Sequence, residues 1–316
     1  MRVTKHFKLG VSSSSVSFLN VNVLKDNRLF VDPAVIRMEA SGNKWAAKAD
    51  RELIEFVDFV LLCLQTPSMH TAGKRALSQF HEPRETRLGM AATGFDGAGA
   101  SERIGDDIWS ALLANPLCQV GVALLKRVED IALFVGNVAD DRISDLTSRI
   151  IIRTLVDYTQ VQMRKHPKLK RNSIMHRLQV WDAASHSWGT AEFELPRVTR
   201  AGAPDSALIL VPKRFVHIGL RMTRGGFWSH GPIAAVQRDE TKSVGVVKGR
   251  ERFQRPDKTE LKQRPELGDI LPTNIEQTLR IWERDQESLI EAYRQFVESK
   301  YEPVTVTQMA SRIPRR

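Results

Sequence analysis

The chain has 316 residues, a formal net charge of +10 and 42% hydrophobic residues, which is the composition of an ordinary globular protein. No apolar run approaches the roughly 20 residues that a membrane-spanning helix needs, because the nearest, residues 54–64, is short and contains Asp58. The basic, serine-rich N-terminal segment lacks the continuous apolar stretch of a secretion signal. We therefore expect a cytoplasmic protein that makes no membrane contact, with Cys63 and Cys118 as buried, reduced thiols.

The first half of the chain is predicted to be rich in helices. Residues 18–23 and 29–31 flank a turn-like Lys-Asp-Asn and predict a β-hairpin. Apolar spacing then predicts helices, and the apolar run 131–138 predicts a strand that leads into a long helix. The predicted helices cover residues 45–65, 69–80, 101–113, 119–128 and 145–163.

The second half has the pattern of short strands, at residues 178–181, 190–195, 207–211 and 215–218. Residues 232–272 are charged and poor in hydrophobic residues, which favours a basic, partly flexible linker. Residues 273–301 predict one long amphipathic helix, with Thr273 and Glu276 as a capping box, able to dock onto a protein partner. We predict a mixed α/β (α+β) fold with a core domain over residues 1–231, the linker, and a C-terminal helix and tail over residues 273–316.

The positive charge is concentrated in one third of the chain. Residues 151–265 hold 22 Lys and Arg against 10 Asp and Glu, whereas the remainder holds 25 against 27. Such an asymmetry attracts polyanions and predicts salt-dependent binding of nucleic acid, DNA or RNA. Solvated loops are the alternative interpretation of each basic run. The candidate nucleic-acid-binding residues are Arg142, Arg164, Lys165, Lys168, Lys170, Arg171, Arg214, Arg221 and Arg224.

The segment DRISD, residues 141–145, contains the best candidates for catalysis. Two carboxylates that follow a strand can hold Mg²⁺, which activates water and neutralises charge on a phosphate. We expect Asp141 and Asp145 to be metal ligands, Glu194 to complete the set, Lys213 to orient the attacking water and Arg142 to contact phosphate. The alternative is structural, since Ser144 or Asp145 can cap the following helix.

The order of these elements, a strand with acids, a second strand with an acid and then a lysine, loosely resembles the PD-(D/E)xK nuclease superfamily. The chain departs from that family because Glu194 is followed by Leu195 and Pro196, where the family has any residue and then lysine. The chain also resembles uncharacterised bacterial proteins associated with mobile elements and phage defence. The segments that carry this resemblance are DNRLFVDP, FHEPRETRLG, the glycine-rich segment, DRISDLT, ELP and LVPK. That resemblance spans residues 19–213 and implies a protein that handles foreign nucleic acid.

Three functions therefore stay open. The first is a Mg²⁺-dependent nuclease of a defence system, and the second is a non-catalytic nucleic-acid-binding or sensor subunit. The third is a nucleotide-handling enzyme that uses the glycine-rich residues 88–105, whose glycines can aim backbone N–H groups at a phosphate but which lack a Walker A lysine. A surface loop is the plainer interpretation of that segment. His81, Glu82 and Glu85, just before it, are candidates for the same polar site as Asp141.

Overall fold

The structure is a computed structural model that describes residues 1–79, 81–89, 98–119, 125–136, 138–200, 202–248 and 250–314. The fold is mixed α/β, as predicted, with mostly short helices and small antiparallel sheets. The elements in chain order are α1 (Val3–His6), β1 (Phe30–Val31), α2 (Pro33–Glu39), α3 (Lys44–Gln65), α4 (His70–Ser78), α5 (Ala98–Ala114), α6 (Pro116–Gln119), α7 (Val128–Phe134), α8 (Asp140–Ile150), α9 (Ile152–Lys165), α10 (Pro167–Lys170), β2 (Ser173–Asp182), β3 (Ser187–Arg200), β4 (Ala203–Ala207), β5 (Val216–His217), α11 (Arg224–His230), α12 (Pro232–Asp239), β6 (Lys242–Val247), β7 (Arg250–Gln254), α13 (Lys258–Gln263), α14 (Pro265–Gly268), α15 (Ile270–Asp285), α16 (Leu289–Ser299) and α17 (Val306–Arg312).

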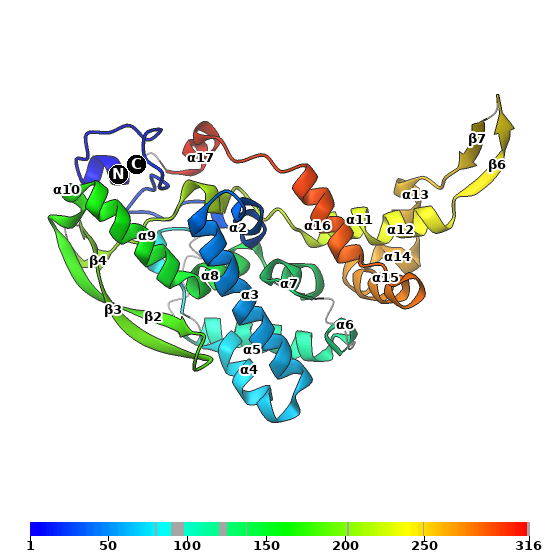
Figure 1. The fold of residues 1–316 in the computed structure, drawn as a ribbon, viewed down its shortest axis with the longest axis horizontal. Coiled ribbons are helices and arrows are strands. Elements are labelled where there is room, and N and C mark those ends of the chain that lie inside the picture. The colour runs from blue at the N-terminus through cyan, green and yellow to red at the C-terminus, as the bar shows by residue number, and fades with distance from the viewer. Residues whose placement is uncertain are drawn as a thin grey trace.

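The molecule is elongated (Figure 1). Helices α2 to α9 and the sheet β2–β3–β4 form a body, from which α11 to α15 extend to one side. The hairpin β6–β7 projects at the end farthest from β2–β3–β4. The two termini lie together, because the Arg2 guanidinium donates to the carbonyl oxygen of Ala310 at 3.2 Å and the Asn22 amide donates to that of Pro314 at 3.0 Å.

Helix α3 runs through the centre of the body. Asn43 caps its first turn by accepting hydrogen bonds from the N–H groups of Trp45 and Ala46. Its buried side chains recur at helical spacing and join the main core, as the sequence predicted for residues 45–65. Residues from α1 to α17 contribute to this one core, so both ends of the chain are part of the body.

The sheets differ from the predicted hairpin at residues 18–31. Strand β1 pairs with β5, which follows 185 residues later, with Phe30 opposite His217. Phe18 forms an isolated bridge with Pro212 instead of pairing with the neighbouring segment. The predicted hairpin is therefore wrong, because its apolar residues pair with the 211–217 segment. The predicted strands at 178–181 and 190–195 are confirmed as parts of β2 and β3, an antiparallel pair with Trp181 opposite Trp188.

The predicted strand at residues 131–138 is also wrong. Residues 128–134 form α7, in which every residue is buried. A short segment that is apolar on all sides gives neither the helical nor the strand period, so the sequence pattern could not separate them. The long helix predicted from residue 145 begins earlier, at Asp140, and is divided at Ile151 into α8 and α9. The helix predicted at 119–128 falls mostly on residues 120–124, outside the described part of the chain.

The C-terminal region contains more structure than predicted. Residues 232–272 form α12, the β6–β7 hairpin, α13 and α14, with a small core of Ile233, Val236, Leu261 and Leu267. The predicted helix 273–301 is two helices, since Gln286 adopts a left-handed conformation after α15. Thr273 lies inside α15 and donates to the carbonyl oxygen of Leu267, so the predicted capping box does not form.

Two further sequence expectations concern membranes and thiols. Among the described residues, no helix is both long and apolar enough to cross a membrane. Cys63 and Cys118 are buried and unbonded to each other, as predicted.

Candidate functional site

Helix α8 carries the DRISD acids on its own first turns. Asp140 and Asp141 occupy the first turn, where carboxylates interact favourably with the helix dipole. Asp140 accepts the N–H of Leu220 at 3.0 Å, and the hydroxyl of Ser144 accepts the N–H of Val31 at 2.9 Å. The helix begins before Ser144 and Asp145, so neither residue caps it. The capping role predicted as the alternative for Asp145 is thereby removed.

The segment that precedes the glycine-rich stretch lies against α8. The buried guanidinium of Arg149 donates to the carbonyl oxygens of His81 at 2.6 Å and Glu82 at 2.8 Å. The side chain of Gln179 on β2 accepts the N–H of His81 at 2.7 Å. Residues 81–89 are therefore held between α8 and β2, although Arg149 and His81 are 68 residues apart in the sequence.

These contacts bring Glu82 close to Asp141 and Asp145, and we call these three residues the α8 acidic cluster. Burial, followed by the negative charges of Glu82 and Asp141, raises the pKa of Asp145 to about 8. The positive charges of Arg142 and Arg149 act in the opposite direction. Within the described part of the chain, the half-buried Asp145 carboxyl has no hydrogen bond or ion pair.

A second group of polar side chains adjoins the cluster. Glu85 lies 3.2 Å from Nε2 of His176 on β2 and 3.8 Å from the Arg149 guanidinium. The Glu85 oxygen that faces His176 is Oε1, while Oε2, the oxygen nearer to Arg149, is buried and accepts no hydrogen bond. Arg149 is thus the residue that joins the segment containing Glu82 and Glu85 to the DRISD helix.

The other two predicted catalytic residues have different partners. Glu194 on β3 accepts the hydroxyl of Ser173 at 2.6 Å and lies 3.8 Å from Lys170. The ammonium of Lys213 donates to the carbonyl oxygen of Ser13 at 2.6 Å. Over the described ranges, no three His, Cys, Asp or Glu side chains are placed to share one metal ion. The structure therefore brings Asp141, Asp145 and Arg142 together but adds neither Glu194 nor Lys213 to them.

Apart from Arg142 on α8, the candidate nucleic-acid-binding residues divide into two groups. Arg214, Arg221 and Arg224 are engaged within the fold, with Glu39 at 3.0 Å, the carbonyl oxygen of Lys300 at 3.0 Å and that of Val135. The remaining exposed cations gather at α9 and α10, at the end of the body farthest from the β6–β7 hairpin (Figure 1). These are Arg164, Lys165, Lys168, Lys170 and Arg171.

Sequence reasoning offered Glu82 and Glu85 as candidates for the same polar site as Asp141, but it could not show that they meet, and it did not include His176. Their association is formed by contacts between α8, residues 81–89 and β2, which no local pattern encodes. The one sequence signal is composition, because His81, Glu82 and Glu85 form a polar group in the sequence.

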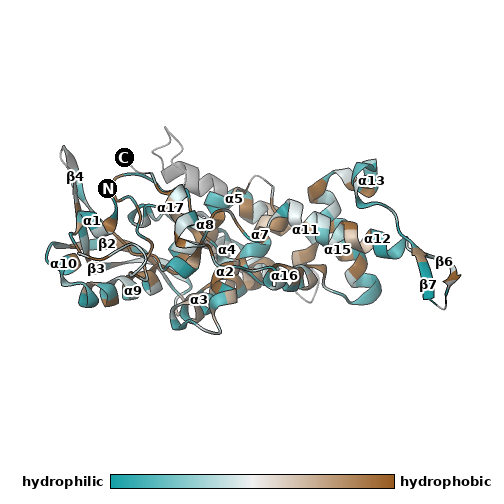
Figure 2. Cartoon of the chain, turned by 90° about the horizontal axis from the view of Figure 1, so that it is seen from above, coloured by the Kyte–Doolittle hydropathy of each residue, from teal (hydrophilic) through white to brown (hydrophobic). Residues whose placement is uncertain are grey.

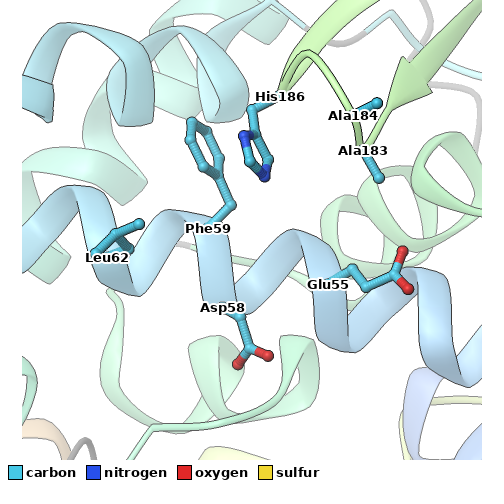
Figure 3. A pocket seen from close by; sticks show the side chains of 7 residues that line it. All are labelled: Glu55, Asp58, Phe59, Leu62, Ala183, Ala184 and His186. Carbon is cyan, nitrogen blue, oxygen red and sulfur yellow. The ribbon is translucent and has the colours of Figure 1, made fainter.

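A pocket of about 530 Å³ lies elsewhere, between α3 and the β2–β3 turn (Figure 3). His186 stacks on Phe59 there, with ring centroids 4.4 Å apart. Of the described residues, no lysine or arginine lines this pocket, and Glu55 and Asp58 would repel a phosphate. Its lining residues are Glu55, Asp58, Phe59, Leu62, Ala183, Ala184 and His186.

The fold and the site define a mixed α/β protein with an acidic cluster formed by α8 and the segment that carries Glu82. A family model described as "Domain of unknown function (DUF8370)" matches residues 8–221, which is about two thirds of the chain, and the protein belongs to this family. No curated protein and no solved structure matches the chain. The matched range includes the α8 acidic cluster and ends before α11 and the β6–β7 hairpin.

Proposed function

We propose that the protein is a divalent-metal-dependent nuclease that acts on foreign nucleic acid in the cytoplasm of a bacterium, as part of a defence system. The observation that carries the proposal is the environment of Asp145. A half-buried carboxyl that has no partner among the described residues, and that two nearby carboxylates repel, is unfavourable unless a proton or a cation accompanies it.

Two carboxylates are enough for magnesium in enzymes that act on phosphates. Mg²⁺ keeps several waters and takes one or two protein carboxylates, with substrate phosphate oxygens in the other positions. Asp141 and Asp145 lie four residues apart on α8, on one face of the helix, and would hold the cation, with Glu82 beside them. When bound, the cation would supply an activated water and neutralise charge on the phosphate.

Two arginines near the cluster have roles other than binding the metal ion. Arg142, on the same turn as Asp141, makes no ion pair with a described residue and can contact a phosphate. Arg149 is a positioning residue, since its hydrogen bonds hold the segment that carries Glu82. The defence setting rests on the resemblance to proteins associated with mobile elements and phage defence.

The test combines cleavage with binding. Labelled single- and double-stranded DNA and RNA are incubated with the protein in Mg²⁺, Mn²⁺ or EDTA, for the native chain and for Asp145→Asn. We expect cleavage that requires metal and is lost in Asp145→Asn, while binding in EDTA persists. Asp157→Asn, which removes an exposed carboxylate paired with Lys48 at 2.5 Å, is the matched control. Cleavage by Asp145→Asn at the native rate would refute the proposal.

The variant Glu194→Gln separates two versions of the site. If Glu194 is a ligand, as the sequence pattern suggested, cleavage is lost in this variant. If the α8 acidic cluster is the site, cleavage survives in Glu194→Gln and is lost in Glu82→Gln.

A non-catalytic nucleic-acid-binding or sensor subunit is the second candidate. It is favoured by the absence, among the described residues, of three side chains placed to share a metal ion. Salt-sensitive binding without products in either metal would support it. A partner docked on α16 would have little apolar surface to use, because Leu289, Ile290, Tyr293 and Val297 pack into the chain's own core and leave only part of Phe296, which is 38% exposed.

A further inference from the structure

The β6–β7 hairpin is exposed at every residue whose burial is described, and it lies outside the range that the family model matches. All five residues of β7 are exposed, as are Val244, Val246 and Phe253, by 57%, 65% and 51%. The hairpin extends away from the rest of the molecule in both views, with β6 largely apolar and β7 largely hydrophilic (Figures 1 and 2). We call residues 242–254 the ribbon.

The pairing register sorts the ribbon's side chains onto two faces. Residues opposite each other in an antiparallel pair share a face, and neighbours along a strand alternate. Arg252 lies opposite Gly245 and Gln254 opposite Lys242, so Lys242, Arg250 and Arg252 share one face. Val246, Glu251 and Phe253 share the other. The irregularity between Ser243 and Gly245 inserts one residue, and this places Lys242 on the arginine face.

The basic side chains of the ribbon differ from those at its base in having no acidic partner among the described residues. Beside it, Arg238 pairs with Glu287 at 3.0 Å, Arg264 with Glu240 at 2.6 Å, and Arg284 with Asp239 at 2.8 Å. Within the described ranges, Lys242, Arg250 and Arg252 make no ion pair. The fold therefore satisfies the charges at the base and leaves one face of the ribbon with three free cations.

The base holds the ribbon firmly. The Gln237 amide donates to the carbonyl oxygen of Pro256 at 2.8 Å, just beyond β7. Asp257 caps α13, and Leu261 of that helix is fully buried with Ile233 and Val236. A projecting element fixed in this way can be inserted into a groove without first being ordered.

We infer that the ribbon binds double-stranded DNA with its Lys242, Arg250 and Arg252 face in the major groove. A two-stranded ribbon fits the major groove of B-DNA, about 12 Å wide, whereas the major groove of duplex RNA is too narrow for side chains to read. Arginine suits both guanine edges and phosphates, so the cationic face can contact the base edges and the flanking backbone. This inference rests on the proposed function in that nucleic acid is the ligand, and it names duplex DNA as the class.

The test measures binding in EDTA, so it does not depend on cleavage. Fluorescence anisotropy compares a 30-base-pair DNA duplex with an RNA duplex of the same sequence, at several salt concentrations. The ribbon variant carries Lys242→Gln, Arg250→Gln and Arg252→Gln. The control carries Lys25→Gln, Arg51→Gln and Arg75→Gln, which remove the same charge from exposed positions on the body.

We expect the ribbon variant to lose about tenfold or more of its DNA affinity and the magnitude of its log–log salt slope to fall by about 2 to 3, since each lost phosphate contact removes about 0.9. The control should bind almost as the native chain does, and the native chain should prefer the DNA duplex. Equal losses in the two variants, or equal binding of DNA and RNA duplexes, would overturn the inference. A chain that binds DNA through the ribbon but cleaves nothing in Mg²⁺ would refute only the nuclease.

Discussion

The guanidinium of Arg294 on α16 donates to the carboxylate of Asp130 on α7, although 164 residues separate them in the chain. Asp130 is fully buried and also accepts the N–H groups of Lys126 and Arg127, at 2.8 and 2.9 Å. A buried carboxylate is tolerated when it is paired and hydrogen-bonded in this way. The pair fixes α16 to the body that carries the candidate site.

Removal of one partner of this pair should destabilise the whole protein. Arg294→Met leaves the Asp130 carboxylate buried without a countercharge, which typically costs about 3–5 kcal/mol. We expect that loss in the free energy of unfolding measured with urea. Adding Asp130→Asn to Arg294→Met should restore part of it, because no charge then stays buried. If Arg294→Met alone is as stable as the native chain, the ion pair does not hold α16 on the body.

The raised pKa of Asp145 predicts how stability depends on pH. An unfolded aspartate has a pKa near 3.9, while that of Asp145 in the fold is about 8. Between these values the folded state retains a proton that the unfolded state has lost, so the free energy of unfolding falls as pH rises from about 4 to about 8. Asp145→Asn should flatten this decline by a few kcal/mol, as measured by urea unfolding at a series of pH values. The same slope in both proteins would contradict the environment described for Asp145.

Helix α5 packs on α4 through a glycine that has no room for a side chain. A Cβ atom at Gly105 would lie 2.1 Å from the carbonyl oxygen of Leu77 and 2.3 Å from Cα of Ser78, and backbone atoms cannot rotate away. Gly105→Ala should therefore destabilise the protein by about 1–3 kcal/mol or more. Gly225→Ala on α11 meets no atom within 4 Å and should be neutral or slightly stabilising. Thermal unfolding of the two variants gives the comparison, and equal effects would refute it.

Burial should protect both thiols in the native protein. It raises the pKa of Cys63 above its usual range and that of Cys118 to about 12. Because the thiolate is the reactive form, an aromatic disulfide reagent at pH 8 should react with neither cysteine before unfolding and with both in denaturant. A native chain that reacts rapidly at one cysteine would argue against the packing of α3 or α6.

The sequence pattern predicts helices well where only one face of the helix is buried, and poorly where all of its faces are buried. Helix α3 was placed within a residue, because its apolar side chains repeat at 3.6-residue spacing. Helix α7 was taken for a strand, since all seven of its residues are buried. The break at Gln286 lacks glycine and proline, so no local signal divided α15 from α16.

The candidate site was predicted only in part. Asp141, Arg142 and Asp145 are neighbours in the sequence and on α8, so the pattern alone selected them. Glu82 reaches Asp145 only because Arg149 spans from α8 to the backbone of residues 81 and 82. A contact between segments 60 residues apart depends on tertiary packing, which a single sequence does not encode in a local motif.

A two-stranded hairpin has two open edges, and each offers unpaired backbone N–H and C=O groups to any other strand. Exposed edges with apolar residues such as Val246 and Phe253 are sites where chains add to one another and aggregate, and lysine or arginine at such edges opposes this. The cations of β6 and β7 thus also act as gatekeepers that keep the molecules apart. Neutralising them carries a cost in solubility, and the protein concentration at which precipitation starts will report that cost independently of any ligand.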